Sequence, residues 1–256
     1  MSKPGFMPRA IRPGALSLPC RAIGRAGELA TTPSTRACTR PGGSHVGRMD
    51  RRLTWFCVLL LPVLVWSAVR PHDYFTWFLE VVPARVGVPL MLATGKRFPL
   101  SSLLLILIWW HCVVLIFGGH YTYALVPLGE WAKDWFGWTR NNYDKLGHFA
   151  QGFVPAILAR EILLRTSPLG NRGDGRPSRW LGFLVVSVCL AFSALYELIE
   201  WLTAVTSGAA ADAFLGTQGD PWDTQTDMAM ALAGAVCAVV AMPRLHDRSL
   251  AKIRRG

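Results

Sequence analysis

A carboxylate and an imidazole lie four residues apart in the motif YDKLGH, residues 143–148. Residues at this spacing share one face of a helix. Asp144 is therefore predicted to orient His148 and raise its basicity, or to bind a metal jointly with it. Tyr143 and Gln151 are further candidates beside this pair. The alternative is purely structural. Asp144 would then be an acidic residue of the first turn that interacts favourably with the helix dipole, and His148 an ordinary histidine at the membrane interface.

Two more carboxylates, Glu197 and Glu200, lie three residues apart in SALYELIEW, residues 193–201. Two carboxylates this close in a poorly solvated place repel each other, which favours a cation or a shared proton between them. Glu197 is predicted as a catalytic residue and metal ligand, Glu200 as a metal ligand and Tyr196 as a neighbour. The alternative is that this segment lies among solvated headgroups.

A third polar motif is GTQGDPWDTQTDM, residues 216–228. Gly219 and Pro221 indicate a turn, and Asp223 is predicted to cap the helix that follows. Asp227 lies one turn later on the same face. Asp223 and Asp227 are predicted metal ligands, and three neighbours are further candidates: Asp220, Gln218 and Gln225. The alternative is a loop whose acids only cap the helix and stay solvated.

The apolar stretches beside these motifs are too short to cross a membrane alone: 146–159, 181–196 and 228–242. A spanning helix needs roughly 20 largely apolar residues. Each of these helices must therefore also include the polar residues next to its apolar stretch. Ionisable groups at membrane depth are costly and usually functional. We expect an all-α, polytopic transmembrane bundle with about six spans: 53–69, 74–93, 99–117, 143–164, 180–202 and 225–243. The second is the weakest, since it contains Glu80, Arg85 and two prolines.

The distribution of Arg and Lys predicts the orientation, because basic residues favour the cytoplasmic side. With six spans and both termini inside, most basic residues of the loops lie inside. The three polar motifs then gather at the extracytoplasmic face. The first three spans show no comparable polar cluster in the sequence.

Composition agrees with a membrane protein, since 52% of residues are hydrophobic and only 17% are charged. The net charge of +11 does not predict nucleic-acid binding, because most of it comes from residues 1–48. This tail is rich in Pro, Gly and Ser, and we expect it to be disordered. It is also interpretable as a targeting segment or as the product of a mis-called start, with Met49 as the true one. Residues 49–256 are predicted to form a single transmembrane helical domain.

These motifs resemble the YjdF-like family of bacterial inner-membrane proteins, a family of unknown function. The resemblance covers about residues 55–243 and is carried by four runs: YTYA at 121–124, NYDKLGHF at 142–149, YELIEW at 196–201 and FLGTQGDPWDTQ at 214–225. It implies a multi-pass protein of the inner membrane. A fainter similarity to VanZ-like proteins lies in Asp144, His148, Glu197 and a later Asp, with Glu200 where a Gln is expected.

The sequence thus favours a membrane protein with an outward-facing acidic site that binds a divalent metal or a polar headgroup of an envelope lipid or precursor. Such a site could hydrolyse or transfer the headgroup. Two alternatives remain: a small proton-coupled transporter, and a non-catalytic scaffold whose acids are merely solvated. The sequence specifies neither a substrate nor an oligomeric state.

Overall fold

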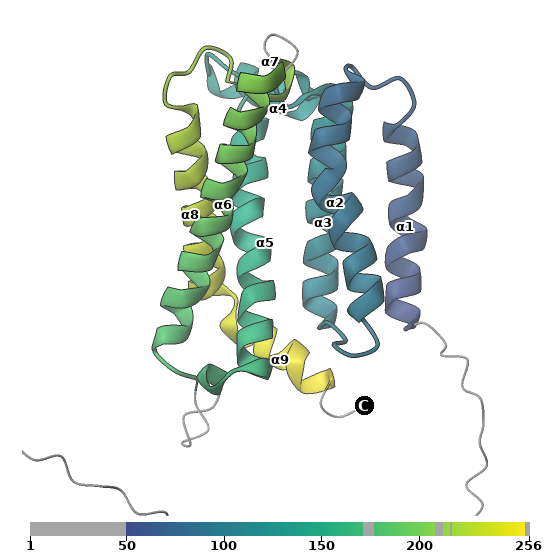
Figure 1. The fold of residues 1–256 in the computed structure, drawn as a ribbon, viewed down its shortest axis with the longest axis vertical. Coiled ribbons are helices and arrows are strands. Elements are labelled where there is room, and N and C mark those ends of the chain that lie inside the picture. The colour runs from purple at the N-terminus through teal and green to yellow at the C-terminus, as the bar shows by residue number, and fades with distance from the viewer. Residues whose placement is uncertain (1–49, 171–176, 208–211, 216, 254–256) are drawn as a thin grey trace, which may run out of the picture. The chain divides into compact units, whose positions relative to one another are not determined.

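The computed structural model describes residues 50–170, 177–207, 212–215 and 217–253 (Figure 1). The basic tail of residues 1–48 and the alternative start at Met49 lie outside the described residues. Every regular element in the described part is a helix, so the all-α prediction is confirmed. The described helices belong to one compact unit, residues 46–256.

Six long helices alternate in direction along the unit of residues 46–256 (Figure 1). They are α1 (Arg51–Ser67), α2 (Tyr74–Thr94), α3 (Ser102–Tyr121), α5 (Tyr143–Thr166), α6 (Trp180–Ser207) and α8 (Asp223–Ala241). Each coincides with one of the expected spans, including the second. Shorter helices connect them or follow them: η1 (Tyr123–Leu125), α4 (Pro127–Phe136), η2 (Pro168–Gly170), α7 (Asp212–Leu215) and α9 (Pro243–Ile253).

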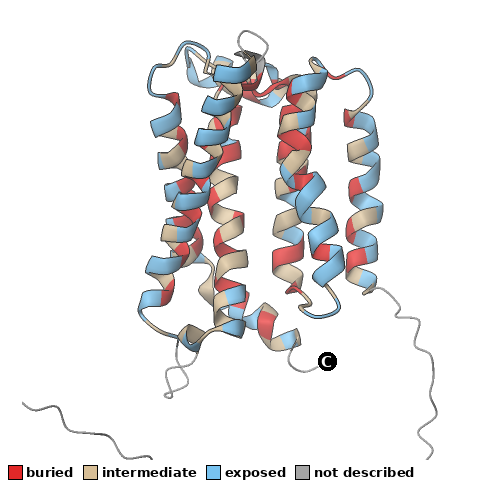
Figure 2. Ribbon diagram, in the orientation of Figure 1, coloured by how far each residue is buried: buried red, intermediate tan, exposed pale blue. Residues whose placement is uncertain are grey.

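Four of the described helices, α2, α3, α6 and α8, are long and apolar enough to cross a membrane. Helix α1 has 17 residues, and α5 carries several charged side chains along its length. Exposed residues cover the outward sides of the long helices (Figure 2), and many are large hydrophobics such as Trp55, Phe183 and Val240. Such a surface suits lipid rather than water. The expectations of six spans and cytoplasmic termini stay predictions.

Close packing of α5 against α8 brings two of the polar motifs together. A Cβ atom added at Gly152 of α5 would overlap the backbone carbonyl of Ala231, and one at Gly234 of α8 would overlap that of Phe149. Small residues let helix backbones approach in this way. Helix α5 also packs against α6 and α3, and α6 packs against α8. Helix α5 is therefore in contact with three of the other long helices.

A separate buried polar network lies at the opposite end of α5 from Asp144. Glu161 Oε1 accepts hydrogen bonds from Arg165 Nη1 at 2.8 Å and from the Ser101 backbone N–H at 3.0 Å. Its other oxygen lies 3.0 Å from His246 Nε2, on α9. A local ion pair between Glu161 and Arg165 is thus part of a network that joins α5 to α9 and to the start of α3.

Candidate metal and headgroup site

Asp144 and His148 face each other on the first turns of α5. Asp144 Oδ1 lies 3.4 Å from His148 Nε2, and both residues are buried. The expectation that they share one helix face is confirmed. The proline-free first turns of α5, residues 143–152, run as regular helix, which fixes the four-residue spacing in space.

Two further carboxylates from other helices approach the same imidazole. Asp227 Oδ1, on α8, lies 3.8 Å from His148 Nε2, and Glu197 Oε1, on α6, lies 3.8 Å from His148 Nδ1. Glu197 and Asp227 are buried at 5% and 1% relative exposure. His148 is therefore surrounded by three acidic side chains that the chain supplies from three different helices.

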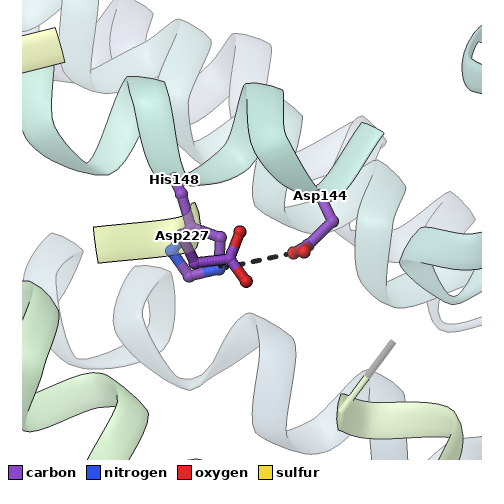
Figure 3. A group of neighbouring side chains, drawn as sticks. All are labelled: Asp144, His148 and Asp227. Carbon is purple, nitrogen blue, oxygen red and sulfur yellow. Dashed lines mark ion pairs between the residues drawn. The ribbon is translucent and has the colours of Figure 1, made fainter. Parts of the chain in front are cut away.

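Asp144, His148 and Asp227 form a cluster that could hold a metal ion. One ligand atom from each lies within 4.8 Å of the others, and Figure 3 shows the three side chains converging from α5 and α8. Bonds of about 2.1 Å in tetrahedral or octahedral coordination place neighbouring ligand atoms roughly 3.0–3.4 Å apart. The separation of 3.4 Å from His148 Nε2 to Asp144 Oδ1 lies at the upper limit of this range, and the separation of 3.8 Å to Asp227 Oδ1 exceeds it.

Polar atoms without a hydrogen-bond partner remain in this cluster. Among the described residues they include Asp144 Oδ2, His148 Nδ1 and Glu197 Oε1. A buried polar atom left without a partner is costly, and these three atoms lie on residues that surround one imidazole. Ser193, on the α6 turn before Glu197, also has a buried hydroxyl without a partner.

Lys145 and Arg140 neutralise the acids at the start of α8. Lys145 Nζ lies 2.8 Å from one oxygen of Asp223 and 2.8 Å from one oxygen of Asp227. Arg140 Nη1 lies 2.9 Å from Asp223 and 3.0 Å from Asp220. Asp223 is therefore an anchor for two basic side chains. It does not belong to the group formed by Asp144, His148 and Asp227.

The expected capping role of Asp223 is wrong. Helix α8 begins at Asp223 itself, with Trp222 in the capping position. The Asp223 side chain instead points to Lys145 and Arg140, and the Trp222 backbone N–H donates to Asp220 Oδ1 at 2.9 Å. The Asp223 carboxylate thus pairs with two half-buried basic groups and does not cap the helix end.

Gln218 joins the loop before α8 to the start of α5 by two hydrogen bonds to Asn141. Its Oε1 accepts from the Asn141 backbone N–H at 3.1 Å, and its Nε2 donates to the Asn141 carbonyl at 2.8 Å. Gln218 and Gly219 both have positive φ values, as a tight turn with two left-handed residues requires. Gln218 therefore positions the loop, and it does not line the cavity described below. Gln225 is exposed.

Asn141 also links this loop to α4. Its Nδ2 donates to Glu130 Oε1 at 3.0 Å and to the Val126 carbonyl at 3.0 Å. The Lys133 ammonium, which donates to Glu130 at 2.6 Å, holds the pKa of the Glu130 carboxyl below its usual value, and Asn141 adds to this effect. Tyr143 also has a structural contact, because its hydroxyl donates to the Val114 carbonyl of α3 at 3.0 Å.

A cavity of about 440 Å³ opens beside the cluster of Asp144, His148 and Asp227. It lies within the range of roughly 300–1,000 Å³ that is typical of small-molecule sites. Its polar wall contains five of the predicted site residues: Asp144, His148, Gln151, Tyr196 and Glu200. Glu197 approaches His148 Nδ1 and does not belong to the lining.

Glu80 and Tyr123 line the same cavity, and both were missed from the sequence. Glu80 is 4% exposed and lies on α2, which Gly119 of α3 allows to approach closely, since a Cβ there would lie 3.1 Å from Glu80 Cβ. Tyr123 is 6% exposed and packs against Gly118 and Gly147. A lone Glu inside an apolar span was the signal that could have identified Glu80.

Fold and site together define a helical membrane protein with a buried acidic centre at one end of its bundle. The chain belongs to the family described as "Predicted membrane protein (DUF2238)", whose model matches residues 52–248. It is 51% identical over 188 residues to the inner membrane protein YjdF of Escherichia coli K12, an alignment that covers 73% of this chain and 87% of the relative. The expected YjdF-like family is thus confirmed. No solved structure matches the chain. The similarity to VanZ-like proteins stays a prediction.

Proposed function

We propose that this chain is a multi-pass inner-membrane protein that binds a divalent cation at Asp144, His148 and Asp227. The cation would hold a polar envelope-lipid headgroup at the extracytoplasmic face for hydrolysis or transfer. The observation that carries the proposal is the buried imidazole within 3.8 Å of three carboxylates. Buried acids in such excess need a cation or a proton among them.

The ligand set suits catalysis more than a purely structural metal. Three protein ligands leave coordination positions open for water and substrate, which is typical of catalytic sites. A cation in this position would polarise a phosphoryl or carbonyl oxygen and activate a bound water. Glu197, on the far side of the ring, would orient His148 through Nδ1. The sequence prediction left His148 as a base or a ligand, with Asp144 orienting it. This assignment differs mainly in leaving Glu197, Glu200 and Asp223 out of the ligands that it predicted beside Asp227.

The extracytoplasmic placement is supported by the distribution of charge. The described basic residues at the opposite end of the bundle include Arg51, Arg52, Lys96, Arg97, Arg160, Arg165, Arg179, Arg244, Arg248 and Lys252. At the site end, Lys145 and Arg140 are both committed to ion pairs with acids. An excess of Arg and Lys marks the cytoplasmic side, so the site would face outward.

Cation binding is tested by thermal unfolding of the full chain in detergent, titrated with Mg²⁺, Mn²⁺ and Zn²⁺ separately. A ligand that binds only the folded state stabilises it in proportion to RT ln(1 + [L]/Kd). We expect at least one of the ions to raise the Tm of the wild type and not of the Asp227→Asn variant. Asp134→Asn is the matched control, because Asp134 is an exposed acid of α4. Equal stabilisation of all three proteins would contradict the proposal.

A proton-coupled carrier is the second candidate function. It is favoured by the imidazole among carboxylates, which can exchange protons, and by the cavity that extends from Asp144 along α5. Against it stands the Glu161 network, whose buried groups are satisfied at the other end of the helix. Water-soluble thiol reagents would label single cysteines along the whole of α6 if a water path exists, and only near its Glu200 end if none does.

A further inference from the structure

Three acidic side chains from three different helices line the cavity beside His148. They are Glu80 of α2, Asp144 of α5 and Glu200 of α6. Glu80 and Asp144 are 4% and 8% exposed, and Glu200 is half-buried. Glu200 is close enough to interact electrostatically with both of the other carboxylates. The described lining contains neither Lys nor Arg, so acidic groups are in excess around the cavity.

The divalent cation of the proposed function would not balance Glu80 or Glu200, because neither belongs to its ligand group. Among the described residues, neither of these two carboxylates forms an ion pair with a basic side chain. The Tyr123 hydroxyl acts on Glu80 as a hydrogen-bond donor but carries no positive charge. Carboxylates in a poorly solvated place need a cation or a proton beside them. Glu80 and Glu200 thus remain to be balanced by something else.

Asp144 contributes a carboxylate oxygen without a hydrogen-bond partner to this wall. Its Oδ1 faces His148 Nε2 at 3.4 Å, whereas its buried Oδ2 accepts no hydrogen bond. Lys145 Nζ lies 3.8 Å from Oδ2, but it lies closer, at 2.8 Å, to both Asp223 and Asp227. An unsatisfied buried acceptor is costly. The second oxygen of Asp144 is therefore available to a hydrogen-bond donor in the cavity.

Two tyrosine rings lie at the acidic part of the cavity, Tyr123 and Tyr196. Close packing fixes Tyr123, since a Cβ atom added at Gly118 or Gly147 would lie 2.6 Å or 2.8 Å from its ring. Tyr196 packs edge-on against His148, with ring centroids 6.4 Å apart. Aromatic faces attract cations, and organic ammonium ions are the ligands that such rings typically bind. Carboxylates and aromatic rings together thus favour an organic cation over a bare metal ion.

The remainder of the cavity is apolar and extends to the lipid-facing surface. It is lined by Leu158, Ala159, Ile162, Val188 and Phe192. Phe192 and Ile162 are 62% and 41% exposed, so this part of the wall reaches the outside of the bundle. Apolar surface of a ligand is stabilised by contact with such a wall. The cavity is therefore complementary to a molecule that is cationic at one end and apolar at the other.

We propose that the cavity binds an organic ammonium ion that carries an apolar substituent. The ammonium group lies beside Glu80 and Glu200, with Asp144 Oδ2 as a further acceptor, and the substituent lies along the apolar wall. A positive charge at this place stabilises the ionised carboxylates. This inference goes beyond the proposed function and does not depend on the divalent cation, whose ligand Asp227 lies outside the lining.

The proposal is tested by equilibrium dialysis of the full chain in detergent with radiolabelled benzyltrimethylammonium, with binding to empty micelles subtracted. Two competitors are matched to the probe in size: neopentylbenzene, its uncharged carbon analogue, and the anion phenylacetate. The buffer contains EDTA, so that the outcome is independent of the divalent cation. We expect saturable binding, against which the neutral and anionic compounds compete at least tenfold less well than the unlabelled ammonium. Equal competition by all three compounds would show that protons balance the carboxylates, and would overturn the proposal, as would the absence of saturable binding.

Substitutions in the wall locate the bound ammonium. Glu80→Gln, and Glu200→Gln in case the first does not fold, should each weaken ammonium binding at least tenfold. Glu130→Gln is the matched control, because Glu130 lies on α4 and outside the lining. Asp227→Asn should bind the ammonium as the wild type does, although it is expected to lose the divalent cation. Unchanged affinity in both cavity variants, or an equal loss in Asp227→Asn, would refute the assignment to Glu80 and Glu200.

Two sources can supply such an ammonium group: the amine headgroup of a membrane lipid and a free amphiphilic amine. The same binding measurement in nanodiscs with and without phosphatidylethanolamine distinguishes them, with phosphatidylglycerol as the remaining lipid. At least tenfold weaker probe binding in the presence of phosphatidylethanolamine assigns the cavity to a lipid amine. Equal binding in both kinds of nanodisc assigns it to a free amine.

Discussion

Lys145 of α5 and Asp227 of α8 meet at 2.8 Å across the closest helix contact of the bundle. The same ammonium lies 2.8 Å from Asp223 and donates to Thr226 Oγ1 at 2.8 Å. One basic side chain thus ties the first turn of α5 to the first two turns of α8. It also lies on the Asp227 oxygen that faces His148, so it sets the charge of the site.

Replacing Lys145 with Met should destabilise the protein in metal-free buffer. Removal of one partner from a buried ion pair leaves uncompensated charge and costs on the order of 3 kcal/mol. Chemical unfolding of the detergent-solubilised protein measures this loss. Lys133→Met is the control, because the Lys133–Glu130 pair is considerably more exposed.

A divalent cation should restore part of the stability of the Lys145→Met variant. The ion would occupy the space between Asp223 and Asp227 that the ammonium vacates, in addition to its own site. The same unfolding curves, repeated with millimolar Mg²⁺ or Mn²⁺, report the recovery. A variant as stable as the wild type without metal would show that Lys145 has no such role.

Gly152→Ala should weaken the α5–α8 contact, because its methyl group would overlap the Ala231 carbonyl. Overpacking of this kind costs typically 1–3 kcal/mol, and here the obstacle is backbone. Gly87→Ala on α2 is the control, since a Cβ there meets nothing within 4 Å. Ala is favoured over Gly in helix interiors by roughly 0.5–1 kcal/mol, so this control should be neutral or stabilising. A thermal unfolding series that shows both substitutions equal would contradict the packing account.

The sequence predicted the helices well because their apolar stretches and polar ends are local signals. The positions of Asp144 and His148 on one face follow from helix geometry alone. The approach of Asp227 to His148 does not, because it depends on Gly152 and Gly234 allowing α5 and α8 to pack closely. Local spacing could identify the acids, but it could not determine which of them meet.

The residues missed from the sequence are those whose role depends on distant partners. Glu80 was interpreted as a weakness of its span, although packing of α2 against α3 brings it to the cavity. Tyr123 precedes the first residue of α5, Tyr143, by 20 residues and lies against Gly147. His246 reaches Glu161 across 85 residues, a contact that no periodicity indicates.

Glu161→Gln should loosen α9 and leave the metal site intact. The substitution weakens charge-assisted hydrogen bonds to Arg165 and His246 in a fully buried place, which contribute roughly 1.5–3 kcal/mol each. Hydrogen exchange of residues 243–253 should accelerate, whereas metal content should not change. Asp247→Asn, at an exposed acid paired with Arg160, provides the comparison. Unaltered exchange would refute the role of Glu161 in anchoring α9.

The Glu130–Lys133 pair should make the contact between α4 and Asn141 sensitive to acid. The pKa of Glu130 is lower in the folded state than its ordinary value, chiefly through the Lys133 hydrogen bond. The unfolded chain therefore binds more protons, and the stabilising effect is present above about pH 4.3 and is lost as pH falls through the folded pKa. Proteolysis of the 126–141 segment should increase with acid in the wild type and be independent of pH in Glu130→Gln. The same dependence of proteolysis on pH in the wild type and in Glu130→Gln would show that Glu130 does not have this role.

The most direct test is the metal content of the full chain purified without chelators, measured by elemental mass spectrometry. The account predicts about one divalent ion per chain in the wild type and in Asp134→Asn. It predicts a loss of that ion in His148→Ala and Asp227→Asn, both checked for a folded, monodisperse state. No bound metal in the wild type, or equal metal in the four proteins, would contradict the cation site.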